Sequence, residues 1–133
     1  IEKIGATGHL AIESRLAHER NIWLATARAD GTPHLVPIWF VWWNEQAWIC
    51  TSPRSVKARN MSLQSKVMFA LEDGDKPALA EAIASRVDAP FAAELAAAFK
   101  AKYGWDINAD SDYGAVFAIK VTRWLSWDTG SAA

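Results

Sequence analysis

Apolar and polar residues in the first half of the chain change from helical to strand-like spacing. Apolar residues recur near helical spacing over residues 9–20, which predicts a short amphipathic helix. Residues 22–28 are rich in strand-forming types and precede Asp30-Gly31, a dipeptide typical of β-hairpin turns. Two more apolar runs, residues 34–43 and 46–51, flank a turn at Asn44 and Glu45. These patterns predict one helix followed by three strands in a meander.

The second predicted strand, residues 34–43, is apolar on both faces, and the third is nearly so. Strands that are apolar on both faces are typical of a closed barrel or a covered sheet. Pro37 lies in the middle of the second strand, where it has no N–H to donate to a ladder. We therefore expect an edge, a bulge or a binding site at this position.

The second half of the chain adds further helices and strands. Ser55 is a suitable N-cap for a helix running to about residue 64, and residues 67–71 form another short apolar run. Residues 78–87 are ambiguous, because their many alanines favour a helix whereas their alternation allows a strand. A helix predicted from Pro90 ends at Gly104, and residues 113–127 alternate as a long last strand. This order predicts a mostly antiparallel barrel with helices at its ends.

Composition and charge narrow the function classes. With 133 residues, 51% of them hydrophobic and 22% charged, the chain fits one globular domain over residues 1–133. Its formal charge of -1 does not favour binding to nucleic acid or to an anionic membrane. The single Cys50 excludes an intramolecular disulfide, and the three histidines show no metal-ligand spacing. No apolar run is long enough to span a bilayer, so we expect a cytoplasmic protein with neither nucleic-acid nor membrane partners.

A hydroxyl-rich and basic segment follows the third predicted strand. A phosphate monoester needs cations, hydroxyls or free backbone N–H groups, and a helix N-terminus supplies the last of these. The segment combines these groups in Thr51, Ser52, Arg54, Ser55, Lys57 and Arg59, which makes it a candidate phosphate site. The alternative is a solvated loop and a surface helix. Since the chain has no glycine-rich loop of the Rossmann or Walker kind, any nucleotide is held in another way.

Five tryptophans lie in or beside the predicted hairpin, at positions 23, 39, 42, 43 and 48. Burial in a core or a dimer interface accounts for most of them. Trp39 differs because it follows the irregular position Pro37 by two residues. His34 begins the second strand, where a polar strand end is its simplest role. No Ser-His-Asp, Cys-His or paired-carboxylate pattern stands out, so no catalytic residue is assigned and a bound cofactor is expected to carry any chemistry.

Five segments, spread over nearly the whole chain, are similar to those of one known protein family and follow one another in the same order. They are IWLATARADGTPHLVPIWFVW, TSPRSVKARN, FALEDGDKP, FKAKYGWD and FAIKVTRWLSWD. In these segments the chain resembles the pyridoxamine 5'-phosphate oxidase-like flavin and deazaflavin oxidoreductases. The resemblance implies a mostly β, α+β fold: a homodimeric split β-barrel of six to seven antiparallel strands with about three helices. It also implies that residues 78–87 form a strand.

By the same resemblance, FMN lies across the dimer interface, with its ring against the second strand and its phosphate held after the third. Pro37, Ile38 and Trp39 would then contact the ring or the ribityl chain. The residues that would contact the phosphate are Thr51, Ser52, Arg54, Ser55, Lys57, Arg59 and Asn60. Trp124 or Trp127 would come from the partner subunit.

Departures from the oxidase itself change the expected activity. The oxidase has an Arg and a Lys where His34 and Trp39 stand, and its C-terminal substrate-binding segment has no clear counterpart here. The resemblance therefore favours a short oxidase-related flavoprotein that binds FMN and oxidises or reduces a small organic substrate. The alternatives are a reductase dependent on the deazaflavin coenzyme F-420, and a non-catalytic flavin- or haem-binding protein. The small number of clustered basic residues favours FMN over the longer acidic tail of F-420.

Overall fold

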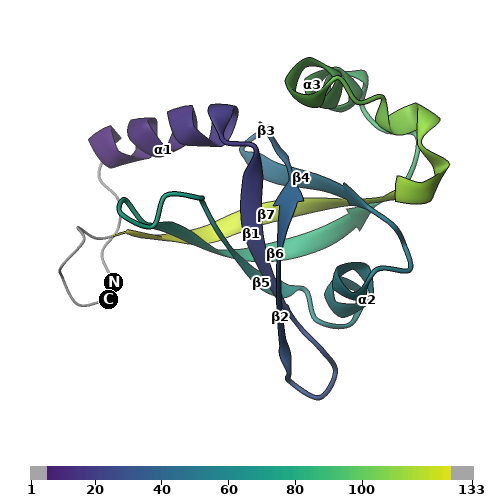
Figure 1. Ribbon diagram of the computed structural model, residues 1–133, viewed down its shortest axis with the longest axis horizontal. Helices are drawn as coiled ribbons and strands as arrows, with labels where there is room; N and C mark the ends of the chain where they lie inside the picture. The colour runs from purple at the N-terminus through teal and green to yellow at the C-terminus, as the bar shows by residue number, and fades with distance from the viewer. Residues whose placement is uncertain (1–5, 127–133) are drawn as a thin grey trace.

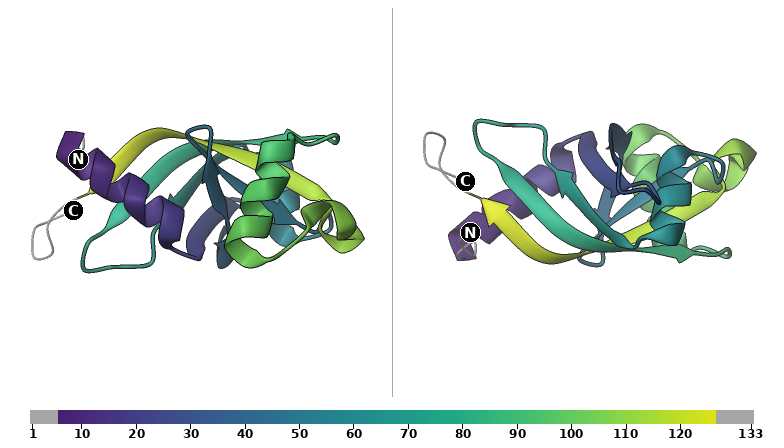
Figure 2. Two further views of the ribbon diagram at one scale, coloured as in Figure 1. Left: turned by 90° about the horizontal axis from the view of Figure 1, so that it is seen from above. Right: turned by 90° about the horizontal axis from the view of Figure 1, so that it is seen from below.

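One curled antiparallel sheet dominates the protein. The computed structural model describes residues 6–126. Within them the strands are β1 (Asn21–Ala27), β2 (Pro33–Trp39), β3 (Val41–Trp43), β4 (Gln46–Thr51), β5 (Lys66–Ala70), β6 (Ala78–Val87) and β7 (Ala115–Ser126). They lie in the order β2-β1-β5-β6-β7-β4-β3, and the sheet curls into a half-barrel (Figures 1 and 2). The predicted mostly β, antiparallel fold is confirmed, and residues 78–87 form a strand.

Three α-helices and two short 3₁₀ turns accompany the sheet in the described part of the chain. They are α1 (Ala6–His18), α2 (Val56–Leu63), α3 (Ala93–Tyr103), η1 (Ile107–Ala109) and η2 (Ser111–Tyr113). Helix α3 begins at Ala93, so the predicted start at Pro90 is wrong; the N-cap is Ala92, whose side chain has no oxygen to cap the helix. The helix ends as predicted at Gly104, whose φ of 66° lies in the left-handed region.

Local turn chemistry explains both hairpins. Strands β1 and β2 are joined through Asp30-Gly31, where Gly31 has a φ of 89°. The Thr32 N–H donates to Asp30 Oδ1 over 3.0 Å, and bonding from Thr32 lowers the pKa of Asp30. Strands β3 and β4 are joined at Asn44 and Glu45, which both have the positive φ that a type I′ turn requires.

The chain changes direction at Phe40, between β2 and β3. The single strand predicted over residues 34–43 is therefore wrong, and so is the simple meander: β2 and β3 lie at opposite edges of the sheet. The physical reason is that the backbone groups of Phe40 bind side chains of α3, Tyr103 and Lys102, and not a neighbouring strand. Pro37 lies on the edge strand β2, as its missing N–H predicted.

The concave face of the sheet encloses the main hydrophobic core. Large buried side chains, among them Phe40, Phe69 and Phe117, fill this space. Every second residue of β6 from Ala78 to Ala84 is a buried alanine, because the aromatic rings leave little room on that strand. Helix α1 contributes Ile12 and Leu16 to this core, and α2 contributes Ala58 and Met61. The alanine-rich segment is thus a strand for reasons of packing.

A second, smaller core lies under α3, on the other side of the sheet. Leu95 and Phe99 of α3 pack there against Trp48 and Cys50 of β4 and Val116 of β7. Strand β4 is consequently buried on both faces, as its apolar pattern predicted.

In the described part of the chain, the sheet around β1 and β2 has no such cover on its outer face. Alternate residues of β2 are exposed; Leu35 is 61% exposed, and Trp23 opposite Pro37 on β1 is 43% exposed. Exposed apolar side chains on a shared face are typical of an interaction surface. Within residues 6–126, no helix has the length and hydropathy needed to cross a membrane.

Candidate functional site

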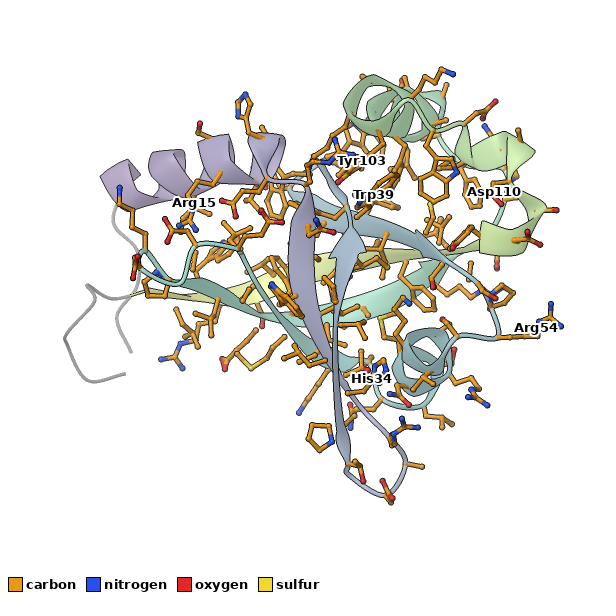
Figure 3. The ribbon with its side chains drawn as sticks, in the orientation of Figure 1. Arg15, His34, Trp39, Arg54, Tyr103 and Asp110 are labelled. Carbon is orange, nitrogen blue, oxygen red and sulfur yellow. The ribbon has the colours of Figure 1, made fainter. Side chains whose placement is uncertain are left out.

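A cavity of about 670 Å³ lies between the end of β2, the end of β4 and the segment that follows α3. Its lining residues are Asn21, Pro37, Ile38, Trp39, Cys50, Thr51, Lys57, Tyr103, Gly104, Trp105, Asp110 and Tyr113. Figure 3 shows Trp39, Tyr103 and Asp110 gathered at this end of the molecule, away from His34. Five residues predicted from the sequence, Pro37, Ile38, Trp39, Thr51 and Lys57, are brought together here.

Lys57 is the cation of the cavity wall. It lies in the first turn of α2, and burial lowers the pKa of its ammonium group. In the part of the chain that the structure describes, Lys57 makes no ion pair. A half-buried cation without a counter-charge is stabilised by an anion, so Lys57 is suited to bind one.

The hydroxyls at the start of α2 form a short chain. Thr51 Oγ1 donates to Ser55 Oγ over 3.1 Å, and the Ala58 N–H donates to the same oxygen over 3.2 Å. Ser55 is therefore the predicted N-cap, and its own hydroxyl proton stays available for an outside acceptor. Its cap leaves the N–H groups of Val56 and Lys57 without intrahelical acceptors, which adds two donors beside the ammonium group.

The other residues predicted to contact phosphate do not line this cavity. Ser52 Oγ accepts from the Arg54 N–H, while the Arg54 and Arg59 side chains are exposed, Arg54 pointing outward in Figure 3. Asn60 is buried and donates from Nδ2 to Thr26 Oγ1 over 3.0 Å. Its side-chain amide is therefore already hydrogen-bonded inside the barrel.

Trp124 and Trp127 are the two tryptophans expected to come from the partner subunit, and the structure describes only Trp124. Trp124 packs on the main core, with its ring 5.7 Å from that of Phe69 and nearly perpendicular to it. Its indole therefore faces the interior of its own chain. Trp127 lies outside the described residues.

Aromatic rings form one wall of the cavity. Trp39 stacks on Tyr103 with ring centres 4.4 Å apart and planes 7° from parallel. Trp105 meets Trp39 edge-on at 6.2 Å, and Tyr113 meets Trp105 edge-on at 5.6 Å. Because Trp39 is still 40% exposed, it offers a flat apolar surface to a planar ligand.

Two neighbouring residues of α3 hold the backbone next to Trp39. Tyr103 Oη accepts from the Phe40 N–H and lies 2.6 Å from the carbonyl oxygens of both Phe40 and Arg20. Lys102 Nζ donates to the Phe40 carbonyl over 3.0 Å. Burial raises the pKa of Tyr103 to about 12 and lowers that of Lys102 to about 8.

Asp110 orients another part of the wall. Its Oδ2 accepts from Trp105 Nε1 over 3.0 Å, and its Oδ1 accepts from the Asp112 N–H over 3.2 Å. The carboxylate therefore fixes the Trp105 indole. Burial, together with the charge of Asp110, raises the pKa of the Cys50 thiol to about 12, so this thiol is an unreactive wall residue.

The sequence did not point to the wall supplied by Tyr103, Trp105, Asp110 and Tyr113. The apolar stripe of α3 placed Tyr103 in a core, and nothing local showed that this helix ends against β2. The signals were the density of aromatic residues in Tyr103-Gly104-Trp105, where the helix ends, and the family resemblance of the segment FKAKYGWD.

His34 lies away from this cavity, opposite Thr26 in the β1–β2 pair. Its Nδ1 is buried and has no hydrogen-bond partner among the described residues. Among residues 6–126, no cluster of histidine, cysteine, aspartate and glutamate side chains is arranged to hold a metal ion.

Comparisons with known proteins agree with this fold. The family model described as pyridoxamine 5'-phosphate oxidase matches residues 10–128. No curated protein matches the chain. Among solved structures, the conserved hypothetical protein Rv2991 from Mycobacterium tuberculosis is similar, with 25% identity and a TM-score of 0.79 over 96% of this chain and 90% of that one.

Two further solved structures share the fold. The haem storage protein HutZ from Vibrio cholerae has 19% identity and a TM-score of 0.76, over 94% of this chain and 95% of its own. A protein described as F420 reductase has 22% identity and a TM-score of 0.69, over 85% of this chain and 94% of its own. The same architecture is thus found in proteins named for different cofactors.

Proposed function

Because this chain belongs to the pyridoxamine 5'-phosphate oxidase family, we propose that it is a homodimeric FMN-dependent oxidoreductase acting on a small conjugated organic substrate. The observation that carries the proposal is the cavity that joins a half-buried, unpaired Lys57 to the exposed indole of Trp39. FMN has an anionic phosphate at one end and a flat ring at the other, so it needs both features. The residues present fit this cofactor.

Lys57 is the main phosphate contact in this proposal. Its ammonium group supplies the charge, and the Ser55 hydroxyl and the free N–H groups of the first turn of α2 supply neutral donors. Arg54 and Arg59 stay exposed beside the same turn, where they add long-range attraction for an anion.

Pro37, Ile38 and Trp39 form the ring end. The edge position of β2 leaves its backbone accessible there, and the stack on Tyr103 fixes the orientation of Trp39. When bound, the flavin would supply the acceptor or donor of a hydride or of electrons. The protein's own contribution is to bind and orient: the aromatic wall excludes water from one side, and Asp110 holds Trp105 in that wall.

The uncovered outer face around Trp23 and Leu35 is the proposed dimer interface. Both side chains are large, apolar and substantially exposed in one chain, and Pro37 of the cavity lies opposite Trp23 on the same pair of strands. A second copy packed on this face would place its own residues next to the cavity. The proposed site is therefore completed by the partner.

The cofactor that copurifies with the protein tests this function. We expect a yellow protein with flavin absorbance bands and an FMN affinity well above its F-420 affinity, both measured by quenching of tryptophan fluorescence. A colourless protein that takes up no FMN would refute the proposal, and tight binding of F-420 alone would replace FMN by the deazaflavin. Turnover of a reduced nicotinamide with a panel of acceptors then separates an enzyme from a flavin carrier.

Haem is a weaker candidate for the same cavity, although HutZ shares the fold. In the part of the chain that the structure describes, none of the residues lining the cavity is a histidine. The cavity also contains a cysteine and tyrosines, which are other side chains that bind haem iron in proteins. The raised pKa of Cys50 keeps its thiol protonated.

A further inference from the structure

A second cation, Arg20, lies at the aromatic wall of the cavity. Its guanidinium carbon is 5.2 Å from the centre of the Trp39 ring and 4.9 Å from the centre of the Tyr103 ring. A guanidinium on the outer face of Trp39 would be much farther from Tyr103, because the two rings are stacked. The nearly equal distances therefore place Arg20 beside the stack, and the outer face of Trp39 stays uncovered by it.

The guanidinium of Arg20 is held by rings and not by acids. Glu19 is its neighbour in sequence, but the carboxylate of Glu19 pairs with Arg15 and accepts from the Glu72 N–H. The Glu72 carboxylate accepts from the Asn21 N–H. In the described part of the chain, Arg20 makes no ion pair, and no hydrogen bond uses its side-chain donors. It is thus an exposed but oriented cation with free donors.

Arg20 and Lys57 approach the cavity from different elements. Arg20 lies between α1 and β1, directly before the lining residue Asn21, whereas Lys57 belongs to α2. Helices α1 and α2 lie at different ends of the curled sheet (Figures 1 and 2). Lys102 of α3 also lies 5.4 Å from the centre of the Tyr103 ring, but its ammonium group donates to the Phe40 carbonyl. The cavity therefore has Lys57 beside its helical anion site, and Arg20 is the cation with free donors beside its aromatic wall.

We propose that Arg20 binds the carboxylate of a planar conjugated substrate whose ring system lies beside the flavin ring, at the edge of the Trp39–Tyr103 stack. The planar guanidinium group can donate two parallel hydrogen bonds to one carboxylate. Because contact with the rings already restricts the orientation of Arg20, less side-chain entropy is lost on binding. The inference rests on the proposed function, in which Lys57 takes the phosphate of the cofactor and leaves the other cation for the substrate. It makes Arg20 a specificity-determining residue and names acidic conjugated compounds as the substrate class.

Binding of a matched pair of probes tests the inference. Cinnamate and cinnamamide have the same conjugated skeleton, and only cinnamate carries the carboxylate. Their dissociation constants are measured by tryptophan fluorescence on the protein with its copurified cofactor, for the wild type, Arg20→Gln and the control Arg28→Gln. Arg28 is an exposed arginine of the β1–β2 hairpin, at the other end of β1 from the Trp39–Tyr103 stack that Arg20 contacts.

We expect the wild type and Arg28→Gln to prefer cinnamate by about tenfold or more, as for a charge-assisted bidentate contact. Arg20→Gln should lose this preference and keep its affinity for cinnamamide. A preference that survives in Arg20→Gln, or no saturable binding of either probe to the wild type, would overturn the inference. If Arg20 only supported the ring stack, both probes would weaken equally, which also contradicts it.

The FMN affinity of the same variants separates this inference from the proposed function. Arg20→Gln should keep its FMN affinity within a few-fold of the wild type, since the Tyr103 stack still orients Trp39 and the anion site at Lys57 is unchanged. A protein that binds no FMN but shows the Arg20-dependent preference would refute the FMN proposal and retain the carboxylate site. The converse result, FMN binding without the preference, would refute only the carboxylate site.

Discussion

The hydroxyl of Tyr103 binds both backbone groups of Phe40, although the two residues lie 63 positions apart in the chain. It accepts from the Phe40 N–H over 2.9 Å and lies 2.6 Å from the Phe40 carbonyl oxygen. Phe40 is the point at which the chain leaves β2 and enters β3, at the other edge of the sheet. One side chain of α3 therefore replaces the ladder bonds at the corner of the half-barrel. Because Trp39 stacks on the same tyrosine, this corner also fixes the wall of the cavity.

Tyr103→Phe should destabilise the fold by about 1–3 kcal/mol, because the Phe40 N–H loses its acceptor next to a buried side chain. Urea denaturation followed by fluorescence measures the free energy of unfolding. Tyr113→Phe is the matched control, since Tyr113 is an exposed tyrosine of the same cavity wall. Equal stabilities of the two variants would show that the corner does not depend on the Tyr103 hydroxyl.

The pH dependence of stability should report Lys102. Its pKa is lowered from 10.5 to about 8 in the folded protein, chiefly by burial. Between these two values the unfolded chain binds more protons than the folded one, so the free energy of unfolding rises with pH. The destabilising contribution of Lys102 is fully present below about pH 8 and is relieved above it.

Lys102→Met removes this dependence, and urea titrations across that pH window should show it. As the pH rises, the free energy of unfolding of the wild type should increase relative to that of Lys102→Met. The difference between the wild type and Lys100→Met should stay constant, because both proteins contain Lys102. Lys100 is an exposed lysine of the same helix. A wild-type curve parallel to that of Lys102→Met would mean that Lys102 titrates alike in the folded and unfolded chains.

Asn60 should matter for stability and not for phosphate binding. Asn60→Ala leaves the buried Thr26 hydroxyl without the amide donor that now lies 3.0 Å from it, at a cost of about 1–3 kcal/mol. Its FMN affinity, measured where the variant is fully folded, should stay within a few-fold of the wild type. A loss of FMN affinity as large as that of a Lys57 variant would show that Asn60 contributes to phosphate binding.

Most elements of the fold were predictable because their causes are local. The Asp30-Gly31 turn, the Ser55 cap and the Gly104 helix end depend on residues within a few positions of each other. The break at Phe40 was not predictable, since its cause is a tyrosine 63 positions away. The strand over residues 78–87 required the family resemblance, because its alanines fit a curled sheet only against the rings that face them.

The candidate site divides in the same way. Pro37, Trp39 and Lys57 were found because strand irregularity and basic clusters are visible in the sequence. Asp110 and the aromatic wall at the end of α3 were not found, because only the packing of α3 beside β3 and β4 brings them to the end of β2. Arg20 was not found either, although the β1–β2 pairing places it next to Trp39. The sequence placed Lys57 and Asn60 in one cluster. In the structure Lys57 lines the cavity, whereas Asn60 is buried and bonds to Thr26.

Leu35→Glu should convert the proposed dimer into a monomer. Leu35 is 61% exposed in the single chain, so a charge there disturbs the isolated fold little but would be buried in the proposed interface. Sedimentation velocity should show the change in mass. Leu63→Glu is the control: Leu63 is 73% exposed but lies on α2, outside the sheet face. A Leu35→Glu variant with wild-type mass would place the interface elsewhere or exclude the dimer.

Lys57→Ala should weaken FMN binding by more than about tenfold, or about 1.5 to 3 kcal/mol, because a half-buried charge-assisted contact to phosphate is lost. Riboflavin has the same ring and ribityl chain without the phosphate, so its affinity should be nearly the same in the wild type and in Lys57→Ala. Fluorescence titration of both flavins into both proteins, with the exposed Lys100→Ala as control, completes the comparison. Equal losses for FMN and riboflavin would indicate a change in the cavity as a whole, and unchanged FMN affinity would place the phosphate away from α2. A loss confined to FMN would assign the phosphate to Lys57, and with it the direction in which the flavin ring extends toward Trp39.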